Sequence, residues 1–172
     1  MAVRPTYRLR VSTRYRASAE QVWAHGTDVD ALIDEFPLWA PFRFTRSADV
    51  RRALEDGALQ ARIPARIGVF PWTAEVCLTD PGRCFTARGE SSLFSLFVHT
   101  HTVEPVSDGA RRLDDVWFAP ASAPAFVARW TARLFQARHR RAARVLPADT
   151  QSVGQTVLRN VLEDEDLPTI LA

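Results

Sequence analysis

The sequence predicts an α+β fold, in which a curved antiparallel sheet of about six or seven strands packs around one long helix near the C-terminus. Three observations predict it. Apolar and polar residues alternate strictly over residues 6–16, strand-like runs separated by turn residues fill residues 59–119, and the apolar period becomes helical over residues 123–146. Strands followed by a single long helix are typical of an α+β domain.

The N-terminal segment predicts one strand and then two short helices. In residues 6–16 one face carries Tyr7, Leu9, Val11, Thr13 and Tyr15, and the other face is mostly arginine, which indicates a strand with one buried face. Ser18 and Gln21 then form a capping box, which starts the first helix. Apolar residues at helical spacing from Val29 to Phe36 predict the second helix, and Pro37 ends it.

Five strands are predicted between these helices and the long helix. Because proline has no backbone N–H, Pro64 indicates that the strand over residues 59–67 lies at a sheet edge or contains a bulge. The expected strands are residues 59–67, 72–79, 84–90, 93–106 and 111–119. The helix over residues 123–146 would be about 36 Å long and would cross a whole sheet. It carries six arginines and no acidic residue, and Pro147 ends it.

Length and composition favour a single globular domain over residues 5–147, followed by an acidic extension over residues 148–172. A chain of 172 residues with 47% hydrophobic residues buries its own core. We find no apolar run long enough for a membrane span, no secretory signal, and only two cysteines, so we expect a cytoplasmic protein without a metal or other cofactor. The net charge of +2 gives no reason to expect a nucleic-acid partner.

Three short stretches resemble one known superfamily. They are residues 17–23 at the entry to the first helix, residues 97–103 with two histidines separated by one residue, and Gly109 with Leu113, Asp114, Asp115 and Pro120. They are similar to the birch-allergen/START/polyketide-cyclase superfamily (SRPBCC), in particular its bacterial ligand-binding domain proteins. The resemblance implies the helix-grip fold and a cavity for a hydrophobic ligand between sheet and helix. It implies no particular reaction, since members include both carriers and cyclases.

The turn at Ser107–Gly109 sets the pairing of the last two strands. A three-residue loop places Glu104 opposite Arg112, a favourable charge pair, and His101 opposite Asp115. A two-residue Asp108-Gly109 turn would place Glu104 opposite Leu113 instead. We prefer the first register, because it gathers aromatic and polar residues on one face of the hairpin.

The pair of His101 and Asp115 is the best candidate for acid–base chemistry. A carboxylate beside an imidazole fixes its tautomer, as a general base requires. The same pair also fits a mutually satisfied polar contact or a contact to a polar ligand, and with His99 it offers metal-ligand atom types. The expected ligand-binding residues are Trp39, Trp72, Phe97, His99, His101, Asp115, Trp117 and Trp130.

These features favour binding or transport of a small hydrophobic or amphipathic molecule, by a monomer or a homodimer. The alternative is a cofactor-free enzyme of the polyketide cyclase or aromatase type. A third interpretation gives the arginines of the long helix an anionic lipid or nucleic-acid partner, although they also fit a solvated helix face.

The extension predicts a short amphipathic helix over residues 151–162, followed by an acidic run at 163–166. Because the long helix and the first strand are basic, we expect the extension to dock on them, the alternative being a mobile terminus.

Overall fold

The computed structural model describes residues 5–44 and 62–161, which form one antiparallel sheet with three helices. The strands are β1 (Thr6–Tyr15), β2 (Phe42–Phe44), β3 (Arg62–Ile67), β4 (Phe70–Asp80), β5 (Cys84–Glu90), β6 (Phe94–Val106), β7 (Gly109–Pro120) and β8 (Gln155–Val161). The helices are α1 (Ala19–Thr27), α2 (Val29–Glu35) and α4 (Pro124–Val145).

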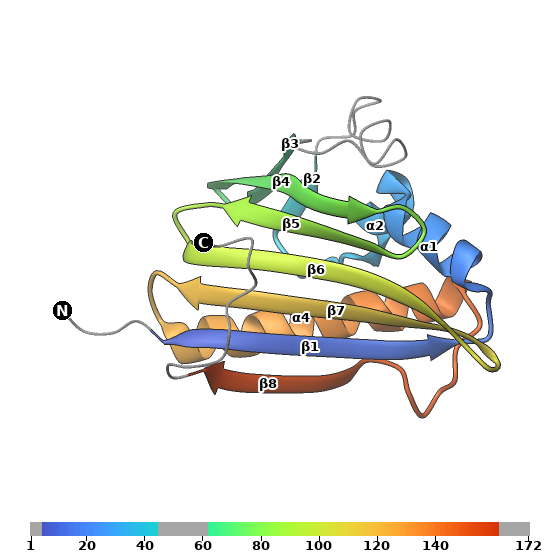
Figure 1. The fold of residues 1–172 in the computed structure, drawn as a ribbon. Coiled ribbons are helices and arrows are strands. Elements are labelled where there is room, and N and C mark those ends of the chain that lie inside the picture. The colour runs from blue at the N-terminus through green and yellow to red at the C-terminus, as the bar shows by residue number, and fades with distance from the viewer. Residues whose placement is uncertain (1–4, 45–61, 162–172) are drawn as a thin grey trace.

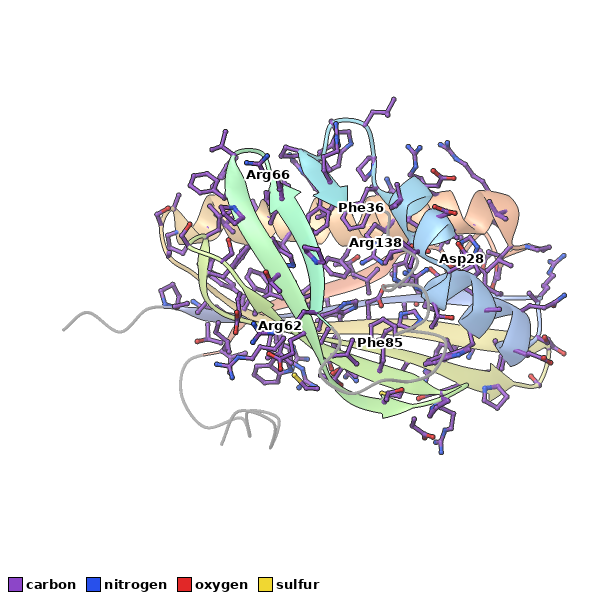
Figure 2. The ribbon with its side chains drawn as sticks, turned by 90° about the horizontal axis from the view of Figure 1, so that it is seen from above. Asp28, Phe36, Arg62, Arg66, Phe85 and Arg138 are labelled. Atoms are coloured by element: carbon purple, nitrogen blue, oxygen red, sulfur yellow. The ribbon has the colours of Figure 1, made fainter. Side chains whose placement is uncertain are left out.

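The eight described strands lie in the order β2-β3-β4-β5-β6-β7-β1-β8. The helix α4 runs along one face of the β7, β1 and β8 half, and α1 and α2 lie near one end of it (Figure 1). Seen from above, β3 and β4 turn steeply away from β1 and β7, so that the sheet curves around α4 (Figure 2). This is the α+β helix-grip arrangement that the sequence predicts.

Local sequence signals explain where the N-terminal elements begin and end. The residues of β1 that point inward are Tyr7, Leu9, Val11, Thr13 and Tyr15, as their alternation predicts. The Ser18 hydroxyl accepts a hydrogen bond from the Gln21 backbone N–H at 3.2 Å, and the Gln21 Oε1 accepts one from the Ser18 backbone N–H. These two bonds confirm the capping box. The second helix ends at Glu35, just before the predicted stop at Pro37.

The long helix begins and ends within one residue of its predicted bounds. Ala123 lies in the left-handed region with φ of 43°, and Pro124 is the first helical residue. A proline is tolerated there because the first turn of a helix has no internal partner for its N–H. In the part of the chain that the structure describes, no helix is both long and apolar enough to cross a membrane.

The predicted register of the β6–β7 hairpin is wrong by one residue. Val106 pairs with Gly109 across a two-residue Ser107-Asp108 loop, so His101 faces Asp114 and Glu104 faces Arg111. The glycine lies in the first pair of the ladder with φ of 141°, and not in the loop. A Cβ there would lie 2.0 Å from the Tyr15 carbonyl oxygen, so the close approach of β1 requires glycine at this position.

The predicted helix over residues 151–162 is also wrong, because this segment contains β8. Residues 155–161 pair with β1 on its free side and extend the sheet, with Leu158 opposite Leu9. The described part of the extension therefore docks on the first strand by backbone pairing. The acidic run at 163–166 and the apolar residues Leu167, Ile170 and Leu171 that follow it lie outside the described residues, as does the start of the predicted strand over residues 59–67.

Candidate functional site

A cavity lies between the concave face of the sheet and the helices α2 and α4. The cavity and its open mouth together contain about 900 Å³ of empty space. The positions that the centre of a water molecule can occupy fill about 100 Å³ of this space. Its wall is formed by Gly26, Leu32, Phe36, Phe42, Ile67, Trp72, Ala74, Phe85, Ala87, Gly89, Phe94, Phe97, His99, Trp130, Thr131, Leu134, Phe135 and Arg138. The wall is overwhelmingly apolar, and its polar side chains are His99, Thr131 and Arg138.

Four of the predicted ligand-binding residues line this cavity. They are Trp72, Phe97, His99 and Trp130. The Trp72 and Phe97 rings meet edge to face at 4.6 Å between centroids, and His99 stands edge to face with Phe135 at 5.2 Å. Gly89 makes room for this packing, since a Cβ there would overlap the Trp72 ring.

Two predicted residues lie beside the cavity but not on its wall. Trp39 belongs to the loop before β2, is 53% exposed, and packs edge to face against Trp130 at 6.5 Å. His101 lies deeper than the wall and is fully buried, with its Nε2 against Gly26. A Cβ on Gly26 would come within 2.8 Å of this nitrogen, so the helix α1 packs closely over the imidazole.

The remaining two, Asp115 and Trp117, are wrongly placed by the sequence prediction. The one-residue change of register turns both side chains to the convex face of the sheet, away from His101. There Asp115 accepts two hydrogen bonds from Arg8, at 2.9 and 3.2 Å, and pairs with Arg10 at 3.2 Å. The Arg8 guanidinium lies over the Trp117 ring at 4.6 Å. This cluster is a surface ion-pair site, so Asp115 is not the partner of the histidines.

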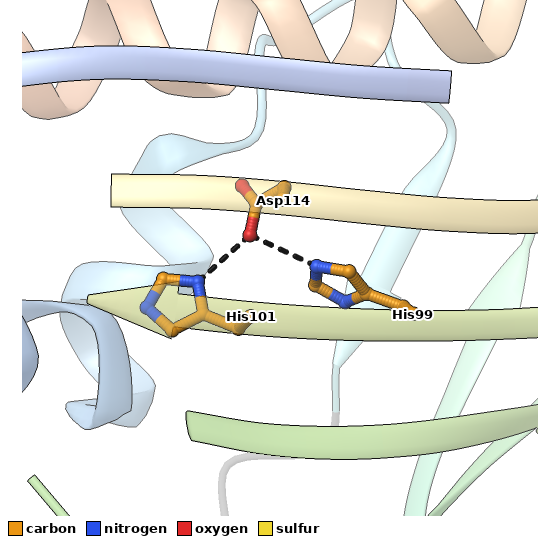
Figure 3. Close-up of side chains that lie close together, drawn as sticks. All are labelled: His99, His101 and Asp114. Carbon is orange, nitrogen blue, oxygen red and sulfur yellow. Dashed lines mark hydrogen bonds and ion pairs between the residues drawn. The ribbon is translucent and has the colours of Figure 1, made fainter. Parts of the chain in front are cut away.

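Asp114 takes the place that the prediction gave to Asp115. Its Oδ1 binds His99 Nε2 at 2.9 Å and His101 Nδ1 at 2.7 Å, which Figure 3 shows. Its Oδ2 binds His139 Nε2 at 2.8 Å and Arg112 Nη2 at 3.2 Å. The carboxylate is completely buried, and four donors from β6, β7 and α4 surround it.

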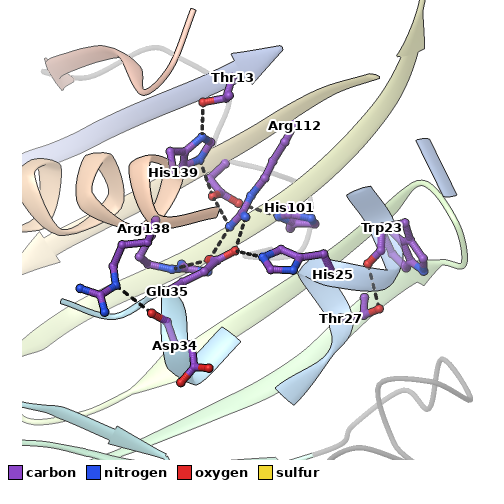
Figure 4. A network of polar contacts seen from close by, with 12 residues as sticks. Thr13, Trp23, His25, Thr27, Asp34, Glu35, His101, Arg112, Arg138 and His139 are labelled. Atoms are coloured by element: carbon purple, nitrogen blue, oxygen red, sulfur yellow. Dashed lines mark hydrogen bonds and ion pairs between the residues drawn. The ribbon is translucent and has the colours of Figure 1, made fainter. Parts of the chain in front are cut away.

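A second buried carboxylate, Glu35, joins the same network from the end of α2 (Figure 4). Arg112 binds both of its oxygens, and Arg138 donates to its Oε2 from Nη2 at 3.0 Å and from Nε at 3.2 Å. His25 Nε2 lies 3.5 Å from its Oε1. The network therefore joins α1, α2, β6, β7 and α4 at the floor of the cavity.

Both carboxylates are ionised in this environment. Burial alone would raise the pKa of Asp114, but Arg112 and the His101 hydrogen bond outweigh it and hold the pKa well below its usual range. Burial would likewise raise the pKa of Glu35, and Arg112 and Arg138 hold it well below its usual range. Two buried negative charges thus face two buried guanidinium groups.

The histidines that contact Asp114 have defined tautomers. An ionised carboxylate only accepts hydrogen bonds, so the nitrogen facing it carries the proton in each ring. Burial lowers the pKa of His101 to about 4 in spite of Asp114, and it also lowers the pKa of His139. Both rings are therefore neutral at pH 7. The second nitrogen of His139 accepts from the Thr13 hydroxyl at 2.8 Å, whereas the second nitrogen of His101 is buried and has no hydrogen-bond partner among the described residues.

Three ligand atoms in the network also have the types that bind metal ions. His99 Nε2, His101 Nδ1 and an Asp114 oxygen all lie within 4.8 Å of one another. Each nitrogen is already hydrogen-bonded to the carboxylate, and Arg112 supplies a fixed positive charge 3.2 Å from it. A second cation would be repelled by that guanidinium, so the donor set favours the hydrogen-bonded network over a metal centre.

The arrangement gives His99 a distinct chemical position. Of the three imidazoles that contact Asp114, His99 is the one that lines the cavity, and its Nε2 is hydrogen-bonded to Asp114. In the neutral tautomer that donates from Nε2 to Asp114, Nδ1 is a lone-pair acceptor, and no partner for this atom occurs among residues 5–44 and 62–161. Such a ring can accept a hydrogen bond or a proton from a molecule in the cavity.

The sequence prediction missed Glu35, Arg112, Asp114, Arg138 and His139. Asp114 was missed because of the register, and a two-residue turn at Ser107-Asp108 would have found it. Glu35 and Arg138 carry no signal of their own, because charged residues on short or arginine-rich helices are usually solvated. Only the tertiary fold brings these two side chains within 3.0 Å of each other.

Known structures share this fold at low sequence identity. Protein CV1439 from Chromobacterium violaceum is 15% identical with a TM-score of 0.62, over 83% of this chain and 98% of that one. Protein Ms6760 from Mycobacterium smegmatis is 13% identical with a TM-score of 0.60, over 83% and 91%. DynU16, a protein in the dynemicin biosynthetic locus, is 14% identical with a TM-score of 0.54, over 81% of this chain and 48% of that one. At these identities the likeness concerns the fold alone.

A search of curated protein sequences found no match to the chain. A family model described as a domain of unknown function, DUF8410, matches residues 13–146, which run from the last residues of β1 to the end of α4 and contain the whole buried network. The chain belongs to the DUF8410 family.

Proposed function

We propose that the chain binds a small hydrophobic or amphipathic molecule in the cavity between the sheet and α4. The observation that carries this proposal is the wall itself, in which fifteen of eighteen residues are apolar or aromatic. Its polar groups are the side chains of His99, Thr131 and Arg138 and the indole N–H groups of Trp72 and Trp130. Small-molecule sites are typically concave and apolar with a few placed polar groups. The resemblance of the sequence to the SRPBCC superfamily supports the same function.

A cavity-filling substitution tests the proposal. Ala87 lies on the wall, and the change Ala87→Leu adds three carbon atoms where a ligand would lie. We expect the wild-type protein to bind the neutral fluorescent probe N-phenyl-1-naphthylamine with micromolar affinity, and Ala87→Leu to weaken that binding at least tenfold. The matched control is Ala125→Leu, the same change on an exposed turn of α4.

Binding that is equal in Ala87→Leu and Ala125→Leu would place the probe outside this cavity and contradict the proposal. Thermal melting of each variant shows that it is folded, and Ala74→Leu fills the same cavity from β4 if the first variant is unstable. Native mass spectrometry of the freshly purified protein would identify a molecule that co-purifies with the wild-type chain but not with Ala87→Leu.

A second candidate is a cofactor-free enzyme of the polyketide cyclase or aromatase type. One observation favours it, namely that His99 lines the cavity while Asp114 fixes its tautomer, which is the arrangement of a general base with its orienting group. One structure with the same fold also belongs to a biosynthetic locus. The two functions differ in the fate of the bound molecule, which a carrier releases unchanged and an enzyme converts, as mass spectrometry of the released molecule would show.

A further inference from the structure

We infer that the ligand is a neutral, planar hydroxyaromatic molecule, and that its hydroxyl group donates a hydrogen bond to Nδ1 of His99. This inference rests on the proposed function and adds the chemical class of the ligand. Three features of the cavity carry it: the free acceptor on His99, the balance of charge behind the wall, and the aromatic rings that form the wall.

The acceptor on His99 follows from the bond that Asp114 accepts. The Nε2 of His99 lies 2.9 Å from Asp114 Oδ1, and that oxygen also accepts the Nδ1 proton of His101 at 2.7 Å. In the neutral tautomer that this bond selects, the proton of His99 lies on Nε2 and Nδ1 keeps its lone pair. A ligand group that donates a hydrogen bond satisfies this atom, whereas an ether or a ketone oxygen does not.

The charges behind the wall cancel, which favours a neutral ligand. Glu35 and Asp114 are balanced by Arg112 and Arg138, and all four side chains are buried. Arg138 also lines the cavity, but its Nε and Nη2 both donate to Glu35, and its guanidinium lies over the Phe36 and Phe135 rings, 5.0 and 5.1 Å from their centroids. A carboxylate in the cavity would add an unbalanced charge to an apolar site.

The rings on the wall favour a flat aromatic ligand. Phe94, Phe97 and Trp72 form one edge-to-face group with centroid distances of 4.6 to 5.7 Å. His99 stands between Phe85 and Phe135 in two further edge-to-face contacts, at 6.0 and 5.2 Å. Aromatic groups prefer such edge-to-face or offset contacts with one another, so a fused ring system fits among these side chains.

The test compares three naphthalenes that differ in one substituent. We would measure binding of 2-naphthol, 2-methoxynaphthalene and 2-naphthoate by isothermal titration calorimetry at pH 7.5. We expect 2-naphthol to bind about tenfold more tightly than 2-methoxynaphthalene, since only the hydroxyl satisfies the His99 acceptor. In His99→Phe this preference should disappear through loss of 2-naphthol affinity, with 2-methoxynaphthalene binding unchanged.

Thr131→Val is the matched control on the same wall. The Thr131 hydroxyl donates to the Val127 carbonyl oxygen at 2.9 Å, so its removal should leave the preference for 2-naphthol intact. A measurement on the wild-type protein alone supports the variants: the ¹⁵N resonance of His99 Nδ1 should shift from its free lone-pair position when 2-naphthol binds, and not when 2-methoxynaphthalene binds.

Several outcomes would overturn the inference. Equal affinity of the wild-type protein for 2-naphthol and 2-methoxynaphthalene, or a preference that survives in His99→Phe, would do so while leaving cavity binding intact. Tightest binding of 2-naphthoate would show an anion site instead. Failure of all three compounds and of N-phenyl-1-naphthylamine to bind would overturn the proposed function and this inference with it.

Discussion

Asp114 shows how one buried side chain determines the properties of its neighbours. It accepts hydrogen bonds from three imidazoles and one guanidinium, and it thereby sets the tautomer of His99, His101 and His139. The next residue in the chain, Asp115, accepts hydrogen bonds from Arg8 and pairs with Arg10 on the convex face. Two chemically identical neighbours thus have different roles, because successive residues of a strand point to opposite faces.

This difference predicts unequal effects of the same substitution at the two positions. Asp114→Asn leaves Arg112 with a buried charge that lacks one of its partners and turns an amide N–H toward imidazole N–H groups, so we expect a loss of about 3 to 5 kcal/mol in unfolding free energy. Asp115→Asn serves as the control and should cost about 1 kcal/mol, since its ion pairs are partly exposed.

Urea-induced unfolding of both variants measures the two costs. Equal losses would contradict the register of the β6–β7 hairpin, and so would a larger loss for Asp115→Asn. If Asp114→Asn does not fold, the soluble yield of the two variants under identical expression conditions gives the same comparison.

At the scale of elements, the strand β8 extends the sheet past β1 and also contacts the long helix. Gln136 of α4 donates to the Thr156 hydroxyl at 2.9 Å, and the Gly154 N–H donates to the Thr13 hydroxyl at 2.9 Å. The latter hydroxyl also binds His139, so the turn before β8 is connected to the buried network. The segment after the long helix therefore supports the candidate site from outside the cavity.

Two adjacent residues of β8 distinguish this strand from a helix. Leu158 packs against the hydrophobic core, whereas Val157 is 50% exposed on the opposite face. We expect Leu158→Ala to cost about 1.5 kcal/mol of unfolding free energy and Val157→Ala less than about 0.5 kcal/mol. An amphipathic helix would bury both residues on one side, so similar costs in chemical denaturation would contradict the strand.

The elements also show which parts of the structure could be predicted from the sequence. The first strand and the long helix were predictable, because each has a long run with a single apolar period and a clear start or stop residue. The hairpin register was not, since Ser107, Asp108 and Gly109 allow several turns and only the contact with Tyr15 decides among them. The spacing of Val153, Val157, Leu158 and Val161 fits a helix as well as a strand, and pairing with β1 decides for the strand.

The candidate site was predicted only in part for the same reason. Aromatic residues of the wall such as Trp72, Phe97 and Trp130 were predictable, because aromatic side chains on inward positions of a curved sheet and its helix meet in its interior. The buried charged residues at the floor of the cavity were not predictable. Glu35, Arg112 and Arg138 lie far apart in the sequence, and each alone has the pattern of a solvated residue.

At the scale of the whole molecule, the network joins the sheet to its helices by ionic and hydrogen-bonded contacts across the interior. Thr13 of β1, Asp114 of β7 and His139 of α4 form one continuous chain of such bonds. Glu35 connects α2 to the same long helix, because it accepts a hydrogen bond from Arg138 of α4. Protonation of these groups therefore acts on the packing of every layer at once.

The stability of the protein should accordingly fall in acid. The pKa of His101 is lowered to about 4 in the folded state, while the unfolded value is near 6.5, so the folded chain binds fewer protons between these values. Its contribution, on the order of 3 kcal/mol, is complete above about pH 6.5 and is lost as pH falls to 4. The pKa of His139 is lowered in the same direction, and the lowered pKa values of Glu35 and Asp114 add a further loss at lower pH.

Urea unfolding at pH 7.5, 6, 5 and 4.5 measures this dependence, and the NMR titration of the imidazole protons assigns it. The His101 resonances should not titrate above about pH 5 while the protein is folded. Unfolding free energies that do not change between pH 7 and pH 5, or a His101 titration near pH 6.5, would contradict the assignment.

The mutual dependence of the buried charges also limits how this family can diverge. Loss of any one of Glu35, Arg112, Asp114 or Arg138 leaves an uncompensated charge in the interior, whereas simultaneous replacement of a whole set by apolar side chains of similar volume carries no such cost. Relatives should therefore keep these positions together or exchange them together, and sequences with an intermediate combination should be rare. Covariation among four positions separated by up to about a hundred residues would then serve as a fingerprint for relatives too distant to be found by overall identity.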